Sequence, residues 1–185
     1  MPPDPAELAL AEACFTGDRL AQRALWERYK NRMFGVCLRF AASRQEAEDW
    51  LQDAFVRVFR DIDQYRGEGS LEGWLRRITV RTALQQLQKQ RLATEMLDDR
   101  QWEQVFQIAE KASGEMQEDD PGQLVMLLQQ LPPGFRAVLN LYVIEERSHE
   151  EIARMLSISV GTSKSQLHRA KAFLRRLLDK TMLLL

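Results

Sequence analysis

The chain has 185 residues, a formal net charge of -1 and a hydrophobic content of 45%, which are ordinary values for a soluble globular protein. It contains no apolar run of the roughly 20 residues that a membrane-spanning helix needs, which argues against membrane insertion. Its N-terminus lacks the basic start and apolar core of a secretory signal. We therefore expect a cytoplasmic protein.

Charge is distributed unevenly along the sequence. Acidic residues outnumber basic ones from Leu92 to Gly122, whereas basic residues outnumber acidic ones from Arg147 to Lys180. Because the positive charge is local, the near-neutral total is compatible with nucleic-acid binding. The two cysteines, Cys14 and Cys37, lie within apolar helical patterns. Since neither has a neighbouring Cys or His to complete a metal site, we expect buried free thiols and no metal or cofactor.

The first half of the chain follows the spacing of helices, and runs that alternate in the manner of strands are absent. A break is expected at Gly17-Asp18. Ser43 is the predicted N-cap of one helix, with Glu46 in the position of a capping-box partner, and Ser70 is the predicted N-cap of another. Helical turns are expected over 8–15 and 20–25, followed by a longer helix over 26–40 and by helices over 46–62 and 70–91.

The second half begins after an acidic segment that we interpret as a linker. A helix over 124–131 is expected to stop at Pro132-Pro133-Gly134, and another spans 135–143. Two further helices follow, over 148–156 and from Ser159 onward. The sequence thus predicts an all-α protein with two small helical domains. The predicted boundaries are 1–91 for the first domain, 92–122 for the linker and 123–185 for the second domain.

Residues 148–171 predict a helix-turn-helix. Ser148 caps the first helix, Glu151 completes a capping box, and Ser159 caps the second helix after the turn. At about 100° per residue, the second helix has an apolar face and an opposite face that is basic and hydroxyl-rich. A helix of this kind can read the DNA major groove, although a merely solvated face is the alternative. The expected DNA contacts are Lys164, Ser165, His168, Arg169 and Lys171.

These motifs closely resemble those of the extracytoplasmic-function (ECF) sigma factors, bacterial members of the sigma-70 family. Sigma factors of this family have two conserved parts, called region two and region four. The resemblance to region four rests on the segments LPPGFRAVLNLY from Leu131, SHEEIA from Ser148 and VGTSKSQLHRAK from Val160. Those for region two are EAEDWLQDAFVRVF from Glu46 and WLRRIT from Trp74. The resemblance implies a protein that is not an enzyme, binds core RNA polymerase and directs promoter-specific transcription initiation.

The resemblance also implies the partners. Region four would read the minus-thirty-five promoter element, and region two would melt and capture the minus-ten element. Core polymerase would be bound through the clamp helices of its β′ subunit and through its β flap. An anti-sigma factor is a further implied partner.

The resemblance assigns two surfaces to region two. The outward face of the helix over 46–62 would bind polymerase, and the helix over 70–91 with the glycine-containing loop before it would hold an unstacked base. Tyr65 in that loop fits a packing role equally well. The implied polymerase-binding residues are Glu48, Asp49, Gln52 and Asp53. The implied residues for the minus-ten element are Tyr65, Ser70, Arg76, Arg77, Arg81 and Lys89.

Some residues depart from the family pattern. Arg81 and Gln85 stand where the family usually has Asn and Asp, so its minus-ten base preference is not carried over. In the reading helix, Ser163 stands in place of a core Val and Gln166 in place of an Arg. The turn more often carries Gly and Pro where this chain has Ser157 and Ser159.

Other classes of protein explain less of the sequence. A helix-turn-helix regulator that acts without core polymerase would leave residues 46–59 unexplained. A helical protein-binding adaptor would leave the basic face of the reading helix unexplained. The sequence contains neither an H-E-x-x-H metal site nor a G-x-S-x-G elbow, so the enzyme class is not supported by these common signatures.

Overall fold

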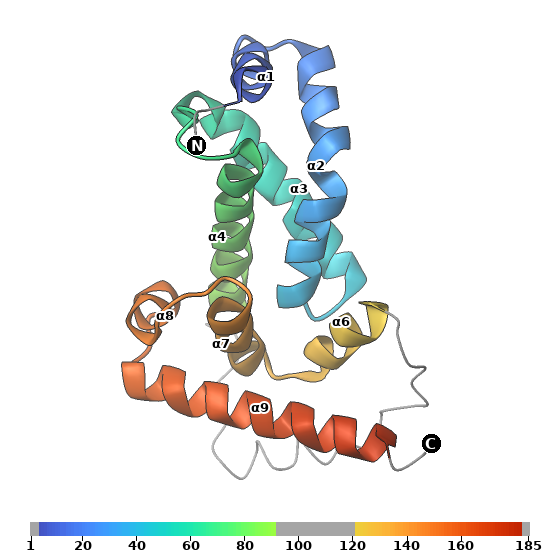
Figure 1. The fold of residues 1–185 in the computed structure, drawn as a ribbon, viewed down its shortest axis with the longest axis vertical. Helices are drawn as coiled ribbons and strands as arrows, with labels where there is room; N and C mark the ends of the chain where they lie inside the picture. The colour runs from blue at the N-terminus through green and yellow to red at the C-terminus, as the bar shows by residue number, and fades with distance from the viewer. Residues whose placement is uncertain (1–3, 92–120, 183–185) are drawn as a thin grey trace. The chain divides into compact units, whose positions relative to one another are not determined.

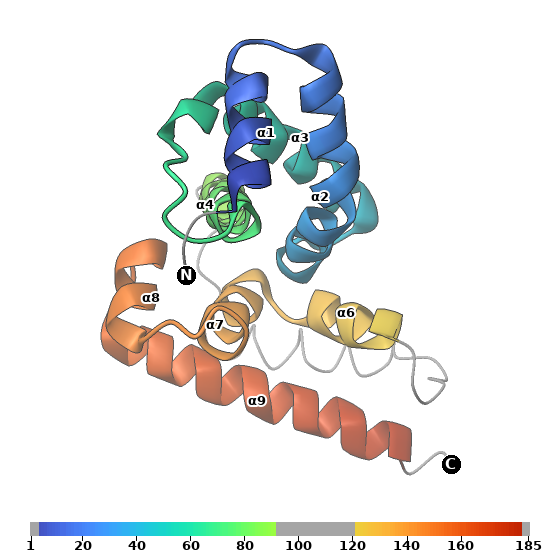
Figure 2. The same ribbon diagram turned by 45° about the horizontal axis from the view of Figure 1, so that its top comes forward.

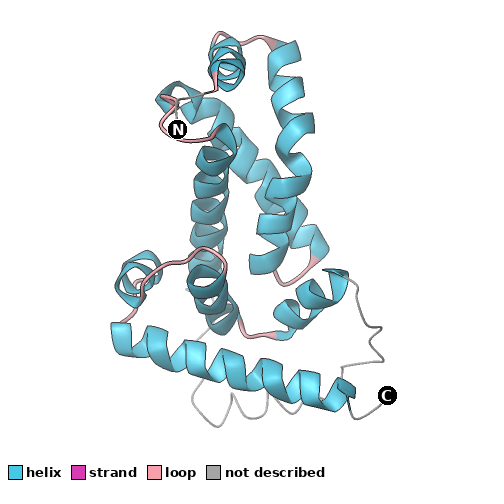
Figure 3. Cartoon of the chain, viewed as in Figure 1, coloured by secondary structure: helices cyan, strands magenta, loops and turns pink. Residues whose placement is uncertain are grey.

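Helices form the regular structure in the parts of the chain that the computed structural model describes, residues 4–91 and 121–182 (Figure 1; Figure 3). No strand occurs in these residues, and the predicted all-α class is confirmed. Contacts divide the chain into two compact units, Met1–Gln86 and Leu87–Leu185. The predicted linker falls mostly outside the described residues, and its last two residues begin helix α6 (Pro121–Gln130).

The first unit is assembled around two long, adjacent helices. Helix α2 packs along α3, and α1 contacts both α2 and η1 (Figure 2). Side chains join α4 to this pair, since Arg32 of α2 donates to Glu72 and Arg57 of α3 donates to Gln85. The elements are α1 (Pro5–Phe15), α2 (Arg19–Phe40), α3 (Arg44–Asp61), the 3-10 helix η1 (Ile62–Gln64) and α4 (Leu71–Arg91).

Side-chain caps fix the starts of these helices. Asp18 accepts a hydrogen bond from the Leu20 N–H at 2.7 Å at the start of α2. Ser43 accepts one from the Glu46 N–H at 3.2 Å at the start of α3. The Glu46 carboxylate reaches back to the N–H of Ala42, one residue before the cap itself. The Ser43 cap is therefore present as predicted, whereas Glu46 accepts from Ala42 and not from Ser43, as a capping box would require.

The core of the first unit is mostly aliphatic, includes several aromatic rings and contains both thiols. The rings of Trp26 and Phe55 meet edge to face with centroids 4.6 Å apart, which joins α2 to α3. Cys14 and Cys37 are free and buried, as expected. Burial raises the pKa of the Cys37 thiol to about 12. Burial, with the negative charge of Asp18, also raises the pKa of Cys14.

The turn between α1 and α2 exposes two apolar residues that the sequence pattern places in the core. Phe15 is 62% exposed and Leu20 is 78% exposed. Gly17, with a φ of 85°, changes the direction of the chain between them. The apolar stripe of α1 therefore does not continue in phase into α2, where Ala21 and Leu25 are buried instead.

The second unit holds α6, α7 (Pro133–Val143), α8 (His149–Leu156) and α9 (Val160–Met182). Helices α7 and α8 both pack on α9 (Figure 2). Pro133 occupies the start of α7, two residues before the predicted start, because a proline fits the first turn of a helix. Tyr142 and Val143, at the end of this helix, are exposed. None of the described helices combines the length and apolarity needed to span a membrane.

The helix-turn-helix has the predicted caps. The Ser148 hydroxyl accepts from the Glu151 N–H at 3.2 Å, and the Glu151 carboxylate accepts from the Ser148 N–H at 2.8 Å. Ser157 ends α8 in the left-handed conformation, with a φ of 54°. Ser159 then caps α9 by accepting from the Thr162 N–H at 2.9 Å. The turn thus forms without the more usual glycine.

Candidate nucleic-acid interface

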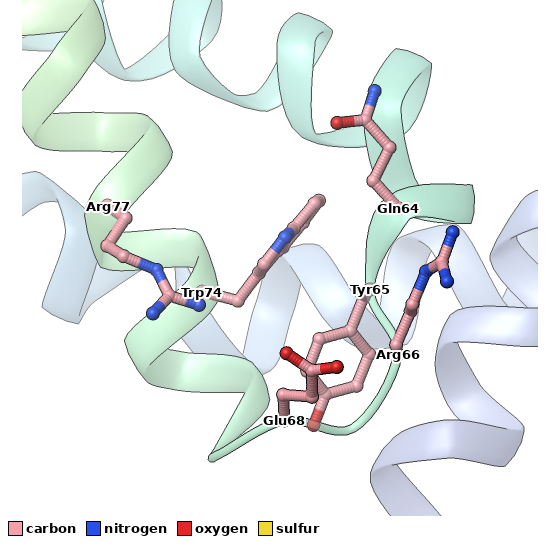
Figure 4. Close-up of a pocket in the computed structure, with 6 residues that line it drawn as sticks. All are labelled: Gln64, Tyr65, Arg66, Glu68, Trp74 and Arg77. Atoms are coloured by element: carbon pink, nitrogen blue, oxygen red, sulfur yellow. The ribbon is translucent and has the colours of Figure 1, made fainter.

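A pocket of about 340 Å³ lies between the start of α4 and the loop that precedes it. Figure 4 shows Trp74 and Arg77 extending from α4, with the other lining residues coming from η1 and the loop. The pocket combines two aromatic rings with two guanidinium groups and one carboxylate, a combination that suits an unstacked base. It is lined by Gln64, Tyr65, Arg66, Glu68, Trp74 and Arg77.

The loop that forms the pocket depends on two glycines and one cap. Gly67 and Gly69 have φ angles of 75° and 90°, which side-chain-bearing residues rarely adopt. Ser70, predicted as a DNA contact, accepts a hydrogen bond from the Gly73 N–H at 3.1 Å. Its side chain therefore caps α4, as the sequence also predicts, and it is exposed at the end of the loop.

Tyr65 packs within the wall of the pocket. It is 7% exposed, and its ring contacts Trp74 with centroids 5.9 Å apart. Its hydroxyl donates to the Gly69 carbonyl at 3.0 Å and lies 3.3 Å from a carboxylate oxygen of Glu7. Tyr65 is thus part of the pocket wall. The half-exposed ring of Trp74 is more available to a base.

The basic residues of α4 do not form a single face. Arg77 lies in the pocket, and Arg81 is exposed one turn further along the same side. Arg76 is half-buried and points about 100° away from Arg77, as successive helical residues do. Lys89 is exposed about 18 Å along the axis from Arg77, three turns away. Of these four residues, Arg77 alone lines the pocket, and Arg81 follows it on the same side of α4.

The sequence predicted the loop that contains Arg66 and Glu68, but it did not mark these two residues, or Gln64 and Trp74, as pocket lining. The i, i+3 spacing of Trp74 and Arg77 on one helix was a usable signal, because it places both on the same face. The departure at Gln85 also has a structural role, since its side-chain oxygen accepts a hydrogen bond from Arg57. Gln85 thereby joins α4 to α3.

The acidic face of α3 is exposed as predicted. Glu48 accepts a hydrogen bond from Arg44 on the same helix at 3.0 Å, and Asp53 accepts one from Gln86 of α4 at 2.5 Å. Asp49 and Gln52 are exposed and have no ion pair among the described residues. Val56, which the sequence reasoning did not single out, is 68% exposed further along this helix. The face thus has acidic and amide groups at its centre and one apolar residue beside them.

The α9 residues predicted to contact DNA lie on its outer side. Lys164, Ser165, His168 and Lys171 are exposed, and Arg169 is half-exposed. Within the first turns of α9, these residues form a polar and mostly basic surface. The opposite side is buried, and it includes Phe173, which the sequence reasoning did not place there. The other buried residues on that side are Ser163, Leu167 and Ala170.

Lys171 is held beside α7 and α8 by an aromatic stack. Its ammonium group lies 5.7 Å from the centroid of the Tyr142 ring, a cation-π arrangement. Tyr142 in turn stacks on the His149 ring at 4.8 Å. The stack joins three helices of the second unit at the surface and leaves the Lys171 charge exposed.

Two departures in α9 have distinct surroundings. Ser163 is fully buried, and its hydroxyl oxygen lies 2.9 Å from Nδ1 of His149. A polar pair between α8 and α9 therefore replaces the apolar contact of a valine. The Gln166 side-chain oxygen is buried, and among the described residues it has no hydrogen-bond partner.

Comparison with known proteins matches each half of the chain to a family. Residues 25–93 match the family described as Sigma-70 region 2, and residues 122–174 match Sigma-70, region 4. The chain is 34% identical over 184 residues to the ECF RNA polymerase sigma factor SigE of Mycolicibacterium smegmatis, covering 96% of this chain and 69% of that protein. It is 31% identical over 170 residues to the ECF RNA polymerase sigma factor SigW of Bacillus subtilis, covering 86% and 90%.

The fold also resembles that of a solved structure. The sigma factor RpoE from Bartonella quintana, in complex with the anti-sigma factor NepR, aligns with a TM-score of 0.50 and 19% sequence identity. The alignment covers 85% of this chain and 96% of that one. At this identity the likeness concerns the fold alone.

Proposed function

Because the chain belongs to the ECF sigma factors of the sigma-70 family, we propose that its two units divide the recognition of one promoter between them. The protein is an alternative sigma factor, which binds core RNA polymerase and directs promoter-specific transcription initiation. A helix-turn-helix regulator independent of polymerase is not favoured, since residues 25–93 match region 2. The proposed boundaries are 1–91 for region two, 92–122 for the linker and 123–185 for region four.

We propose that polymerase supplies the catalysis, that the chain itself catalyses no reaction, and that it acts in the bacterial cytoplasm. The sequence features and the described surfaces fit a protein that binds and positions. The charged groups serve as contacts for DNA and for polymerase in this proposal.

The second unit would read the minus-thirty-five element through α9. The observation that supports this is the exposed, basic first half of α9 directly after a capped turn. Arg and Lys side chains favour guanine edges in the major groove, and the remaining bases can neutralise phosphates. The proposed contacts are Lys164, Ser165, His168, Arg169 and Lys171.

The first unit would capture a base of the melted minus-ten element in the pocket beside α4. Trp74 offers a ring face for stacking, and Arg77 and Glu68 offer donors and acceptors to a base edge. Arg81 would contact the backbone next to the pocket, and Ser70 lies at its rim. Arg76 and Lys89, which do not line the pocket, would meet phosphates further along the strand.

The acidic face of α3 would bind the clamp helices of the polymerase β′ subunit. Asp49 and Gln52 lie at its centre, and Glu48 and Asp53 flank them. Complementary charge of this kind steers association with a basic partner and fixes its register. The β flap would be contacted by the second unit, as the family membership implies.

An anti-sigma factor is a further proposed partner. The related fold of RpoE from Bartonella quintana occurs in complex with the anti-sigma factor NepR. If this chain is regulated in the same way, an inhibitor protein should copurify with it from unstressed cells. That protein should inhibit the transcription in vitro that the chain directs.

Transcription in vitro tests the proposed function directly. The full chain would be combined with core polymerase and a genomic library, and the start sites would be sequenced. We expect a set of start sites that requires the chain and shares two upstream motifs. If the chain neither binds core polymerase nor changes the start sites, the proposal is wrong.

A further inference from the structure

A carboxylate near the start of α1 is buried among three hydrogen-bond donors. Glu7 is 8% exposed. One of its oxygens lies 3.2 Å from the Tyr29 hydroxyl. The other lies 2.7 Å from the N–H of Leu71 and 3.3 Å from the Tyr65 hydroxyl. A single side chain thus joins α1 to α2, to the pocket loop and to the first residue of α4.

The donors from the pocket loop stand at its two ends. The loop begins at Tyr65, directly after η1, and α4 begins at Leu71. Between them, Gly67 and Gly69 have positive φ angles, and the Tyr65 hydroxyl also donates to the Gly69 carbonyl. Glycines allow a loop many backbone conformations. The conformation of this loop therefore depends on the groups that hold its two ends together.

We propose that Glu7 is a positioning residue, which holds the loop from Tyr65 to Leu71 in the conformation that forms the pocket for the minus-ten base. The inference rests on the proposed function of that pocket. Glu7 itself does not line the pocket and would not touch the DNA. It acts by fixing Tyr65, whose ring packs on Trp74.

The charge of Glu7 fits this role. Leu71 N–H is among the first donors of α4, and these have no partner within their own helix. A carboxylate placed there is stabilised by the helix dipole, and Glu7 also lies in the first turn of α1. Burial raises the pKa of Tyr29 to about 12, and the charge of Glu7 adds to the rise. Burial and Glu7 likewise raise the pKa of Tyr65. Both phenols therefore stay protonated at neutral pH. Tyr29 donates to the carboxylate, and the single proton of Tyr65 is shared between the carboxylate and the Gly69 carbonyl.

The test uses the full chain bound to core polymerase. The probe is a single-stranded oligonucleotide that carries the non-template minus-ten sequence of a promoter mapped by transcription in vitro. Glu7→Gln removes the charge of the buried carboxylate, and Tyr65→Phe removes the hydroxyl that contacts it. Both substitutions nearly keep the side-chain volume. Glu12→Gln makes the same chemical change at an exposed site of α1. Tyr29→Phe removes the hydroxyl that Tyr29 donates to Glu7, and it changes no residue of the loop.

We expect Glu7→Gln and Tyr65→Phe each to weaken binding of the oligonucleotide about tenfold, the loss typical of a charge-assisted hydrogen bond. The affinity for core polymerase should stay unchanged, because α3 is not involved. Glu12→Gln should bind the oligonucleotide as the unchanged chain does, and Tyr29→Phe should lose much less than Tyr65→Phe. The double variant of Glu7 and Tyr65 should lose less than the sum of the two single losses, since both act on one contact.

The outcomes separate this inference from the proposed function. If Trp74→Ala loses the oligonucleotide while Glu7→Gln and Tyr65→Phe retain it, the pocket stands and the positioning role is overturned. If Trp74→Ala and Arg77→Ala also retain it, the pocket itself is misassigned. Should Glu7→Gln unfold the first unit, Glu7→Asp decides, because it keeps the charge and withdraws the carboxylate from Tyr65 and Leu71. Equal losses for Tyr29→Phe and Tyr65→Phe would indicate general destabilisation and overturn the inference.

Discussion

Nδ1 of His149 lies 2.9 Å from the hydroxyl oxygen of Ser163, so the two helices of the helix-turn-helix are joined by a polar contact. Ser163 is fully buried at this point. The usual valine would join α8 and α9 through apolar contact alone. In this chain a directed polar contact is added to the apolar packing of the two helices.

The Ser163→Ala variant should lower the free energy of opening of α8 by about 1 kcal/mol, because His149 loses its partner in a part-buried site. Hydrogen exchange of the α8 and α9 backbone amides in the full chain would measure it. The matched control is Ser165→Ala on the exposed side of α9, for which we expect a change within about 0.5 kcal/mol. Equal effects at the two serines would show that the His149 contact contributes nothing.

The Arg169→Ala and Lys164→Ala variants should weaken promoter-specific initiation without changing core binding. A lost base or phosphate contact costs about 1–3 kcal/mol, so initiation from the mapped promoters should fall roughly fivefold to a hundredfold at limiting protein. Arg23→Ala removes the same charge from an exposed site of α2 and serves as control. Loss of polymerase binding in an α9 variant would mean that the two surfaces were misassigned.

Reversing the charge of Asp49 should impair polymerase binding. Asp49→Lys is expected to reduce the affinity for core polymerase by about tenfold or more, through repulsion of a basic partner. Asp49 suits this test because it has no ion pair among the described residues, whereas Asp53 also holds Gln86 of α4. Glu12→Lys, an exposed charge reversal on α1, should bind as the unchanged chain does. Competition for core polymerase measures both, and equal affinities would exclude the α3 face.

The stability of the first unit should fall at alkaline pH in a way that depends on Tyr29. Its pKa is raised from 10.0 to about 12, chiefly by burial. The neutral phenol is therefore favoured by folding, and its contribution is complete below pH 10 and lost as the pH rises to about 12. Denaturant midpoints measured across this range should decline less steeply in Tyr29→Phe. Identical slopes for Tyr29→Phe and the unchanged chain would contradict the expectation.

The sequence predicted those features of the fold that depend on neighbouring residues. Ser43, Ser70, Ser148 and Ser159 all cap helices in the structure, because a cap requires only a side-chain oxygen and an N–H two or three residues later. The helix-turn-helix and the outer side of α9 follow from the same local rules. The apolar residues at chain reversals were less predictable, as the exposed Phe15 and Leu20 show.

Contacts between distant residues were beyond the reach of sequence patterns. Glu7 lies 64 positions before Leu71 and 22 before Tyr29, and no local spacing indicates that they meet. The pocket has the same origin, since Arg66 and Trp74 are brought together by a loop whose shape depends on Glu7. The contact of Ser163 with His149 could not be predicted from the sequence either. Only the departure of Ser163 from the family pattern indicated that this residue needed an explanation.

The burial of the two thiols limits what this protein can sense by itself. Oxidants react with thiolates, and burial raises the pKa of the Cys37 thiol to about 12, so that this thiol stays protonated at neutral pH. Cys37 is fully covered, and Cys14 nearly so. Peroxide or disulfide stress would therefore have to be detected by another molecule and passed to the sigma factor as a change in binding. The folded protein should keep its promoter preference under oxidising conditions that inactivate proteins with exposed, acidic thiols.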